Sequence, residues 1–171
     1  MKEIDWKLLS QLLNNSRRSD RELARAIGSS QPTITRRRNT LEKELIEGYT
    51  AIPRWEKLGY EIMAFTFVKT KEALGPEEQH RPNHAKATEW MMKQPNVIYA
   101  AGCRGMGSNG FMISVHKSYL DFDRFMEKHN GALGPLIDSA ETVMVSLEGR
   151  NTLKPLHFKY LGEDIKNNKA I

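Results

Sequence analysis

The strongest constraint in this 171-residue sequence is a pair of short helices joined by a glycine turn within the first 45 residues. Ser19-Asp20-Arg21-Glu22 has the spacing of a capping box that begins one helix, and Gly28 is placed to end it. Pro32 then falls in the first turn of the next helix, where its missing N–H has no helical partner to lose. Residues 4–13 repeat apolar side chains at helical spacing, with Asp5 as the expected N-cap. Because helices this short are stable only when their apolar faces pack together, the segment predicts a compact three-helix domain.

The glycine turn gives the second and third helices the arrangement of a helix-turn-helix. The N-terminal turns of the third helix, expected at 33–42, would enter the major groove of double-stranded DNA, where short polar side chains reach base edges. Arginines in that helix would reach bases or phosphates, and arginines before the second helix would lie beside the DNA backbone. The predicted DNA-binding residues are Arg17, Arg18, Ser30, Gln31, Thr33, Thr35, Arg36, Arg37 and Arg38.

The placement of charge agrees with this interpretation. The whole chain carries 26 Lys and Arg against 21 Asp and Glu, a net charge of +5. Residues 14–40 alone hold seven Arg against only Asp20 and Glu22, which is also +5. A solvated helix face is the alternative explanation for such a run. Its position within a helix-turn-helix pattern favours contact with phosphate and with base edges.

A spaced set of residues extends the pattern across residues 3–60. The set is Ile4-Asp5-x-x-Leu8-Leu9-x-x-Leu12, Arg17-x-Ser19, Glu22-Leu23-Ala24, Gly28-x-Ser30-Gln31-Pro32-Thr33-Ile34-x-x-Arg37, Leu41-Glu42, Ile46-x-Gly48-Tyr49-Thr50-Ala51 and Leu58-Gly59. In these residues the chain resembles the Lrp/AsnC, or feast/famine, family of transcription regulators. The resemblance implies a winged helix-turn-helix joined to a β-α-β-β-α-β sensing domain of the RAM type. It also implies homodimers that assemble into octamers and respond to an amino-acid-like effector.

Two positions depart from the family pattern. Arg38 stands where the family usually has an apolar residue, on the Ile34 and Leu41 side of the helix. We expect its side chain to lie along the edge of the buried face, with a phosphate contact as the alternative. The glycine that usually ends the recognition helix is also missing. Residues 45–52 are expected to form a short extended segment, either a wing or a linker strand.

Periodicity in the second half predicts an α+β domain of the ferredoxin-like type. The expected strands are residues 60–71, 97–101, 111–116 and 142–147, and the expected helices are residues 83–94 and a helix from 119 that Gly131 closes. The first strand has apolar residues on both faces, although the two helices of such a domain cover only one face. The uncovered face therefore predicts a homodimer. The expected boundaries are 1–59 for the DNA-binding domain, 60–149 for the sensing domain and 150–171 for a C-terminal extension of which part packs.

The segment between the second and third expected strands contains the spacing G-x-G-x-x-G. A dinucleotide site needs a helix after these glycines, but the residues that follow are a strand pattern, so nicotinamide binding is not expected. The family resemblance places the effector loop here, with a G-x-x-D signature whose Asp is replaced by Gly110. The alternative is a flexible hairpin loop. The predicted effector-binding residues are Gly105, Met106, Gly107, Ser108, Asn109 and Gly110.

No catalytic residue, cofactor or metal site is predicted. His80 and His84 flank Pro82, so they do not share a regular helical turn. Cys103 is the only cysteine, which excludes an intramolecular disulfide. No secretory signal or membrane-spanning apolar run is present, and the expected location is the cytoplasm.

Two alternatives to a sequence-specific regulator remain open. One is an architectural protein that organises DNA without an effector, which the loss of the signature Asp favours. The other follows from relatives of this fold that decarboxylate sirohaem with a His-containing motif before the third strand. Residues 102–110 contain no His, which argues against that enzyme.

Overall fold

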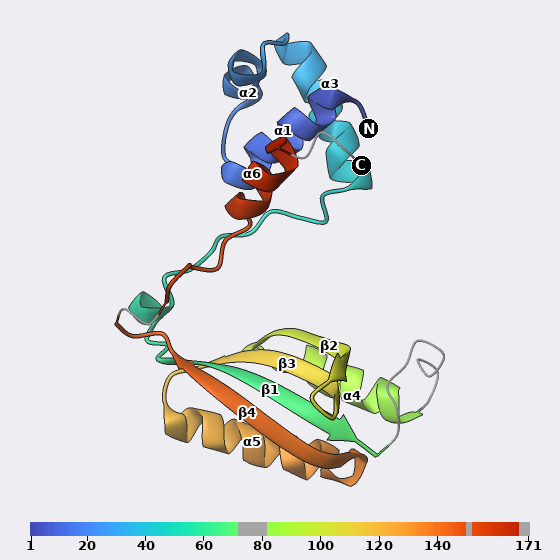
Figure 1. Cartoon of the computed structure of the whole chain (residues 1–171), viewed down its shortest axis with the longest axis vertical. Helices are drawn as coiled ribbons and strands as arrows, with labels where there is room; N and C mark the ends of the chain where they lie inside the picture. The colour runs from blue at the N-terminus through green and yellow to red at the C-terminus, as the bar shows by residue number, and fades with distance from the viewer. Residues whose placement is uncertain (72–81, 150–151, 168–171) are drawn as a thin grey trace. The chain divides into compact units, whose positions relative to one another are not determined.

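The computed structural model describes residues 1–71, 82–149 and 152–167, and these form two compact units (Figure 1). One unit contains Met1–Ile52 together with residues 154–167, and the other contains the described residues of Pro53–Leu153. His80 lies outside the described residues. Within the described ranges, no helix is long and apolar enough to cross a membrane.

The N-terminal unit is built from four helices: α1 (Glu3–Asn14), α2 (Asp20–Ile27), α3 (Gln31–Glu44) and α6 (Lys159–Asn167). Its core is formed by six buried apolar side chains from α1, α2 and α3, namely Leu8, Leu12, Leu23, Ala24, Ile34 and Leu41. The expected three-helix packing is therefore confirmed.

Side-chain caps fix where α2 and α3 begin. The Glu22 carboxylate accepts the Ser19 backbone N–H at 2.7 Å, and the Ser19 hydroxyl accepts the Glu22 N–H at 3.3 Å, which confirms the capping box. Gly28 ends α2 with a φ of +76°, a left-handed conformation that costs glycine little. The N-cap prediction for α1 is wrong. The helix begins at Glu3, and Asp5 lies in its first turn, where it accepts the Lys2 N–H at 2.7 Å.

The expected wing strand is absent, since residues 46–54 form neither helix nor strand. Without a glycine to end it, α3 closes by donating the N–H groups of both Leu45 and Ile46 to the Leu41 carbonyl, each at 2.8 Å. Ile46 packs against the helical core, and the Tyr49 hydroxyl donates to Glu42 at 2.8 Å. Ile46 and Tyr49 are thus the residues of this segment that contact the N-terminal helices.

The C-terminal end of the chain completes the N-terminal unit. The Ser10 hydroxyl of α1 donates to the Gly162 carbonyl of α6 at 2.6 Å, and Ser10 is buried. A Cβ at position 162 would lie only 2.9 Å from the Ser10 carbonyl oxygen, so glycine permits this close approach. The expectation that part of the extension packs is confirmed.

The C-terminal unit is a four-stranded antiparallel sheet in the order β2-β3-β1-β4, with two main helices. The elements are β1 (Ile62–Thr70), α4 (Pro82–Met92), β2 (Val97–Gly105), β3 (Ser108–His116), α5 (Tyr119–Leu133) and β4 (Ile137–Ser146), with 3-10 turns at Trp55–Leu58 and Gly134–Leu136. This order confirms the ferredoxin-like β-α-β-β-α-β fold. Gly131 does not close α5 as expected. The helix continues to Leu133 and ends before Pro135, which has no N–H to continue it.

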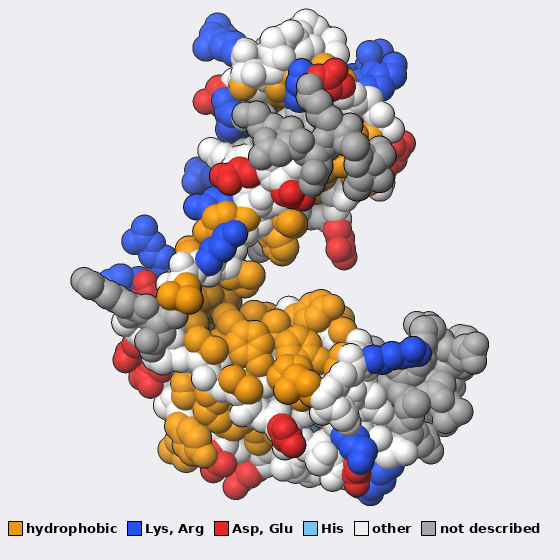
Figure 2. Space-filling view, in the orientation of Figure 1, with side chains coloured by type: hydrophobic (Ala, Val, Ile, Leu, Met, Phe, Trp, Pro, Cys, Tyr) orange, Lys and Arg blue, Asp and Glu red, His pale blue; other side chains and the backbone are white. Residues whose placement is uncertain are grey.

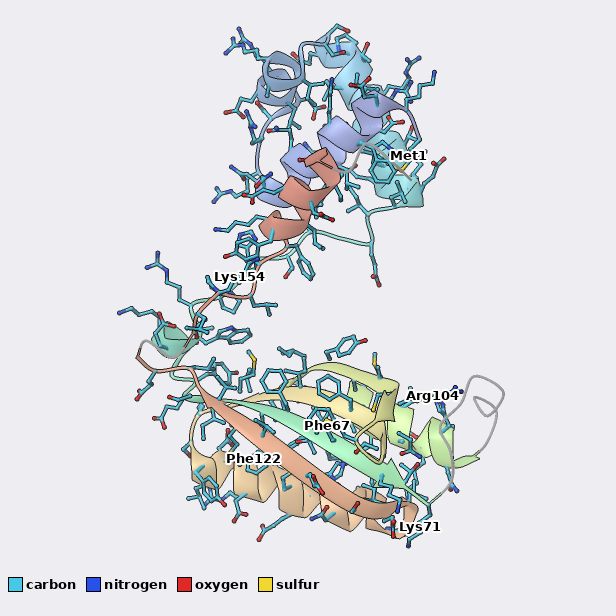
Figure 3. The ribbon with its side chains drawn as sticks, viewed as in Figure 1. Met1, Phe67, Lys71, Arg104, Phe122 and Lys154 are labelled. Atoms are coloured by element: carbon cyan, nitrogen blue, oxygen red, sulfur yellow. The ribbon has the colours of Figure 1, made fainter. Side chains whose placement is uncertain are left out.

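The two faces of the sheet differ in burial. Ala64, Thr66 and Met112 are fully buried on the face that the helices cover, where Phe122 of α5 also packs. The opposite face carries Phe67 and other apolar side chains, which give the broad apolar surface of this unit (Figures 2 and 3). The members of this open face are Met63, Phe65, Phe67, Tyr99, Phe111, Ile113, Val143 and Val145.

Candidate nucleic-acid interface and effector loop

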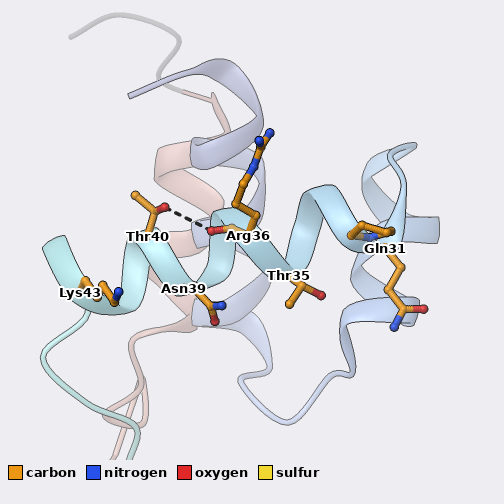
Figure 4. Close-up of a pocket in the computed structure, with 7 residues that line it drawn as sticks. Gln31, Thr35, Arg36, Asn39, Thr40 and Lys43 are labelled. Atoms are coloured by element: carbon orange, nitrogen blue, oxygen red, sulfur yellow. Dashed lines mark hydrogen bonds between the residues drawn. The ribbon is translucent and has the colours of Figure 1, made fainter.

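One face of α3 presents polar and basic side chains outward. Gln31, Thr35, Asn39 and Lys43 recur every four residues, so they stand one above another on the helix. With three neighbours they line a surface hollow of about 790 Å³ (Figure 4). Those neighbours are Pro32, Arg36 and Thr40. All seven residues are exposed.

Three of the predicted DNA-binding residues lie on this face, namely Gln31, Thr35 and Arg36. The Thr35 hydroxyl donates to Asp20 at the start of α2, at 2.6 Å, so its direction is fixed. Arg36 is exposed, and among the described residues its side chain forms no ion pair. Arg36 is therefore the arginine of α3 that is available to an anionic partner.

Arg37 points away from this face, into the helical unit. Its guanidinium contacts the Asp5 carboxylate of α1 at 3.2 and 3.3 Å. The Arg37 side chain is 21% exposed and that of Asp5 is 10% exposed, so the pair is largely withdrawn from water. Arg37 thus braces α3 against α1, and the structure does not bring it together with Arg36. A contact of Arg37 with DNA stays a prediction.

Arg38 is also occupied within the unit. It donates to Asp20 at 3.1 Å, to Glu42 at 2.9 Å and to the Arg18 carbonyl at 3.3 Å, and it lies over the Tyr49 ring at 5.5 Å. Burial opposes the charged form, but the hydrogen bonds with Glu42 and Asp20 outweigh it and raise the pKa of Arg38. The expected edge position is confirmed by these internal partners, and the phosphate contact given as its alternative stays a prediction.

The remaining predicted residues have local roles. The Ser30 hydroxyl caps α3 by accepting the Thr33 N–H at 3.4 Å, and the two hydroxyls lie 2.8 Å apart. Arg18 donates to Gln11 of α1. Arg17 is exposed just before α2, in the position expected for a contact with the DNA backbone.

Sequence reasoning missed Asn39, Thr40 and Lys43, which continue the exposed face toward the end of α3. The signal was present as the four-residue spacing that starts at Gln31.

The predicted effector loop is a tight hairpin. Gly105 pairs with Ser108, which leaves Met106 and Gly107 as a two-residue turn with φ values of 51° and 70°. Two positive φ values are those of a type I′ turn, which matches the twist of the strands. Four of the six predicted residues therefore belong to strands, and the strand after the glycines agrees with the exclusion of a dinucleotide site.

Asn109 ties the hairpin to the end of β1. Its side-chain oxygen accepts the Thr70 N–H at 2.8 Å, and its amide donates to the Thr70 carbonyl at 3.5 Å. Gly110 is buried, and the Met106 side chain is 80% exposed. The hairpin of the alternative explanation is therefore present in the structure. An effector-binding role for the six residues stays a prediction.

Comparisons with known proteins agree with this geometry. Residues 1–42 match the family model of the AsnC-type helix-turn-helix domain. The chain is 39% identical over 70 residues to an HTH-type transcriptional regulator of Pyrococcus furiosus. This match covers 40% of this chain and 47% of the relative. It is also 39% identical over 69 residues to the leucine-responsive regulatory protein of Rhizobium meliloti. That match covers 40% of this chain and 44% of the relative. The matches span about half the length of these relatives.

Solved structures share the fold across both units. A transcriptional regulator of Neisseria meningitidis in complex with L-methionine aligns with a TM-score of 0.76 at 20% identity, covering 91% of this chain and 96% of that one. AsnC of Escherichia coli aligns with a TM-score of 0.70 at 21% identity, covering 91% and 97%. At this level of identity the likeness establishes the fold.

Proposed function

The chain carries an AsnC-type helix-turn-helix domain and has the fold of the Lrp/AsnC regulators, and from this premise we propose that it is a sequence-specific DNA-binding transcriptional regulator, not an enzyme. The observation that carries the proposal is that some polar side chains of α3 are paired within the unit while others face outward. Arg37 and Arg38 are held by carboxylates inside the unit, whereas Gln31, Arg36 and Asn39 face outward. A helix whose inner side is fixed by ion pairs and whose exposed side is polar is suited to binding in the major groove.

The chemistry of the outward side chains indicates their roles on DNA. The amides of Gln31 and Asn39 have the donor and acceptor pair that recognises adenine in the major groove. Arg36 can contact guanine or a phosphate, and Lys43 can contact a phosphate as a point charge. Arg17 would add a backbone contact before α2.

We test this with DNA fragments selected from the genome of the source organism. The double variant Arg36→Ala/Asn39→Ala is expected to lose at least about tenfold in affinity, since each good base contact contributes about 1–3 kcal/mol. The matched control is Lys128→Ala, which removes one positive charge from an exposed site on α5. Unchanged affinity in the double variant, with the fold intact by circular dichroism, would contradict the assignment.

We further propose a homodimer, and octamers built from it, formed through the open face of the sheet. A contiguous apolar face without cover from its own helices is a typical protein interface. A dimer with two copies of α3 would contact half-sites about 10 bp apart or at multiples of that spacing. Light scattering measures the assembly directly.

A small effector, such as an amino acid, is proposed to act at the β2–β3 hairpin. Support comes from the family resemblance and from the Neisseria regulator solved with L-methionine. Gel shifts repeated with each amino acid measure the response. An architectural role without an effector is the second candidate, because Gly110 is buried in β3 where the family signature has an acidic group. Discrete footprints would exclude it, whereas uniform protection would favour it.

A further inference from the structure

One carboxylate of the N-terminal unit connects the exposed face of α3 with a paired arginine on the inner side of the same helix. Asp20, the first residue of α2, accepts the Thr35 hydroxyl through Oδ2 at 2.6 Å and the Arg38 guanidinium through Oδ1 at 3.1 Å. The Asp20 side chain is 21% exposed. Arg38 is itself held by Glu42 at 2.9 Å and by the Arg18 carbonyl at 3.3 Å. Asp20 is therefore fixed through both of its oxygens, and it holds the Thr35 hydroxyl in one direction.

Thr35 lies in the middle of the exposed face of α3. Gln31 stands one turn before it and Asn39 one turn after it, and the three side chains lie along the same side of the helix (Figure 4). Thr35 is itself exposed. A duplex bound against this face would therefore place a base edge at the Thr35 hydroxyl.

The bond with Asp20 decides which hydrogen-bonding role is left to Thr35. A hydroxyl group has one hydrogen to donate and two lone pairs that accept. The hydrogen of Thr35 is directed to a carboxylate, and a hydrogen bond to a charged acceptor is stronger than one to a neutral carbonyl oxygen. The keto oxygen of a base would therefore not draw the hydrogen away from Asp20. Thr35 faces an incoming base as an acceptor only.

An acceptor at this point distinguishes two classes of base in the major groove. Adenine and cytosine present an amino group there, which donates, whereas guanine and thymine present a keto oxygen, which accepts. We propose that Asp20, as a positioning residue, makes Thr35 select adenine or cytosine over guanine or thymine at one base position of each half-site. This inference rests on the proposed function, because it requires α3 to bind in the major groove, and it adds the class of base that is recognised.

Gel shifts with the full chain test the inference on a duplex taken from a footprinted genomic fragment. Each base pair of a half-site is replaced in turn by the other three. At one position the parent should bind duplexes with adenine or cytosine about fivefold more tightly than those with guanine or thymine, which is the effect of one hydrogen bond. Thr35→Val removes the acceptor and keeps the shape, so at this position the four duplexes should bind within about twofold of one another.

Asp20→Ala should remove the same preference by a different route. The freed Thr35 hydroxyl can donate as well as accept, so the guanine and thymine duplexes should come within about twofold of the adenine and cytosine duplexes. The matched control is Glu42→Ala, which also removes a carboxylate partner of Arg38 but leaves the bond between Thr35 and Asp20 in place. It should keep the preference of the parent. A merely structural role of Asp20 would weaken binding to all four duplexes alike.

The outcomes separate this inference from the proposed function. A parent that binds all fragments alike overturns both. The inference alone is overturned if the parent has discrete sites but Thr35→Val keeps every base preference. The same holds if Asp20→Ala, folded by circular dichroism, keeps the preference or loses affinity equally for all four duplexes. Asp20→Ser, whose hydroxyl is too short to reach Thr35, is the second variant in case Asp20→Ala does not fold.

Discussion

At the scale of single residues, the N-terminal unit gives neighbouring arginines of α3 different tasks. Arg36 and Arg37 are adjacent in sequence, but the helix directs Arg36 to solvent and Arg37 toward Asp5 of α1. The Asp5 partner is 32 residues away, so no local pattern in the sequence identifies it. The sequence therefore identifies the arginines of α3 as basic, whereas their internal partners become visible only in the fold.

Arg37→Ala is expected to destabilise the protein by about 1–2 kcal/mol, because it leaves the largely buried Asp5 carboxylate without its partner. Urea unfolding measures the change. Arg36→Ala is the matched control, and its stability should stay within about 0.5 kcal/mol of the parent because the side chain is exposed. Equal stability of the two variants would mean that Arg37 does not brace α1.

The two buried histidines predict how stability depends on pH. Burial lowers the pKa of His129 and of His116 below 6.5, and Asp121, at 3.8 Å from His116, opposes this only in part. The unfolded chain then binds more protons than the folded one below pH 6.5. Stability should be full above pH 6.5 and fall below it, by at most about 1.4 kcal/mol per pH unit for each histidine.

Unfolding in urea at pH 7.5 and at successive steps down to pH 5 measures this dependence. His129→Phe should reduce the slope between pH 6.5 and 5, because one of the two buried groups no longer titrates. A variant whose slope equals that of the parent would show that His129 is not held in its neutral form.

At the scale of elements, helix caps and the alternation of apolar residues along strands predict the local structure correctly. The Ser19 capping box, the Gly28 stop and the order of strands and helices along the C-terminal unit all follow from local patterns. The lack of a strand in residues 46–54, the length of α5 and the exact turn of the hairpin do not follow from local patterns. A type I′ turn with Met106 at positive φ goes against the usual residue preference.

The docking of α6 on α1 could not be read from either helix alone, since it requires a glycine at one point of contact. Gly162→Leu should displace α6, because the new Cβ would lie 2.9 Å from a backbone oxygen that cannot move freely. We expect a loss of about 1–3 kcal/mol in the stability of the N-terminal unit. The control Glu163→Leu introduces the same side chain at the next, exposed position.

Hydrogen exchange of the α1 amides reports this contact most directly. Protection should fall in Gly162→Leu and stay unchanged in Glu163→Leu. Unchanged protection in both variants would show that α6 does not support α1.

At the scale of the whole molecule, the N-terminal unit carries the exposed polar face of α3, and the C-terminal unit carries the apolar open face of the sheet. Val143 is 57% exposed on the open face, on the edge strand β4 and opposite Phe65 of β1. Val143→Glu should therefore leave the unit folded but dissociate the proposed dimer, because it places a charge in the apolar face proposed as its interface. Light scattering measures the mass, and Leu120→Glu on α5, where the side chain is 55% exposed, is the control. A Val143→Glu protein with the parent's mass would exclude this face as the interface.

The proposed function requires α3 to bind specific DNA sequences through an exposed face, while internal ion pairs fix the other side of the helix. Footprinting on selected genomic fragments, with the parent and with Arg36→Ala/Asn39→Ala, tests it most directly. We predict discrete protected half-sites spaced by about 10 bp or multiples of it. We also predict binding that weakens steeply with salt and footprints that disappear in the double variant. Uniform protection without discrete sites, or identical footprints from both proteins, would contradict the account.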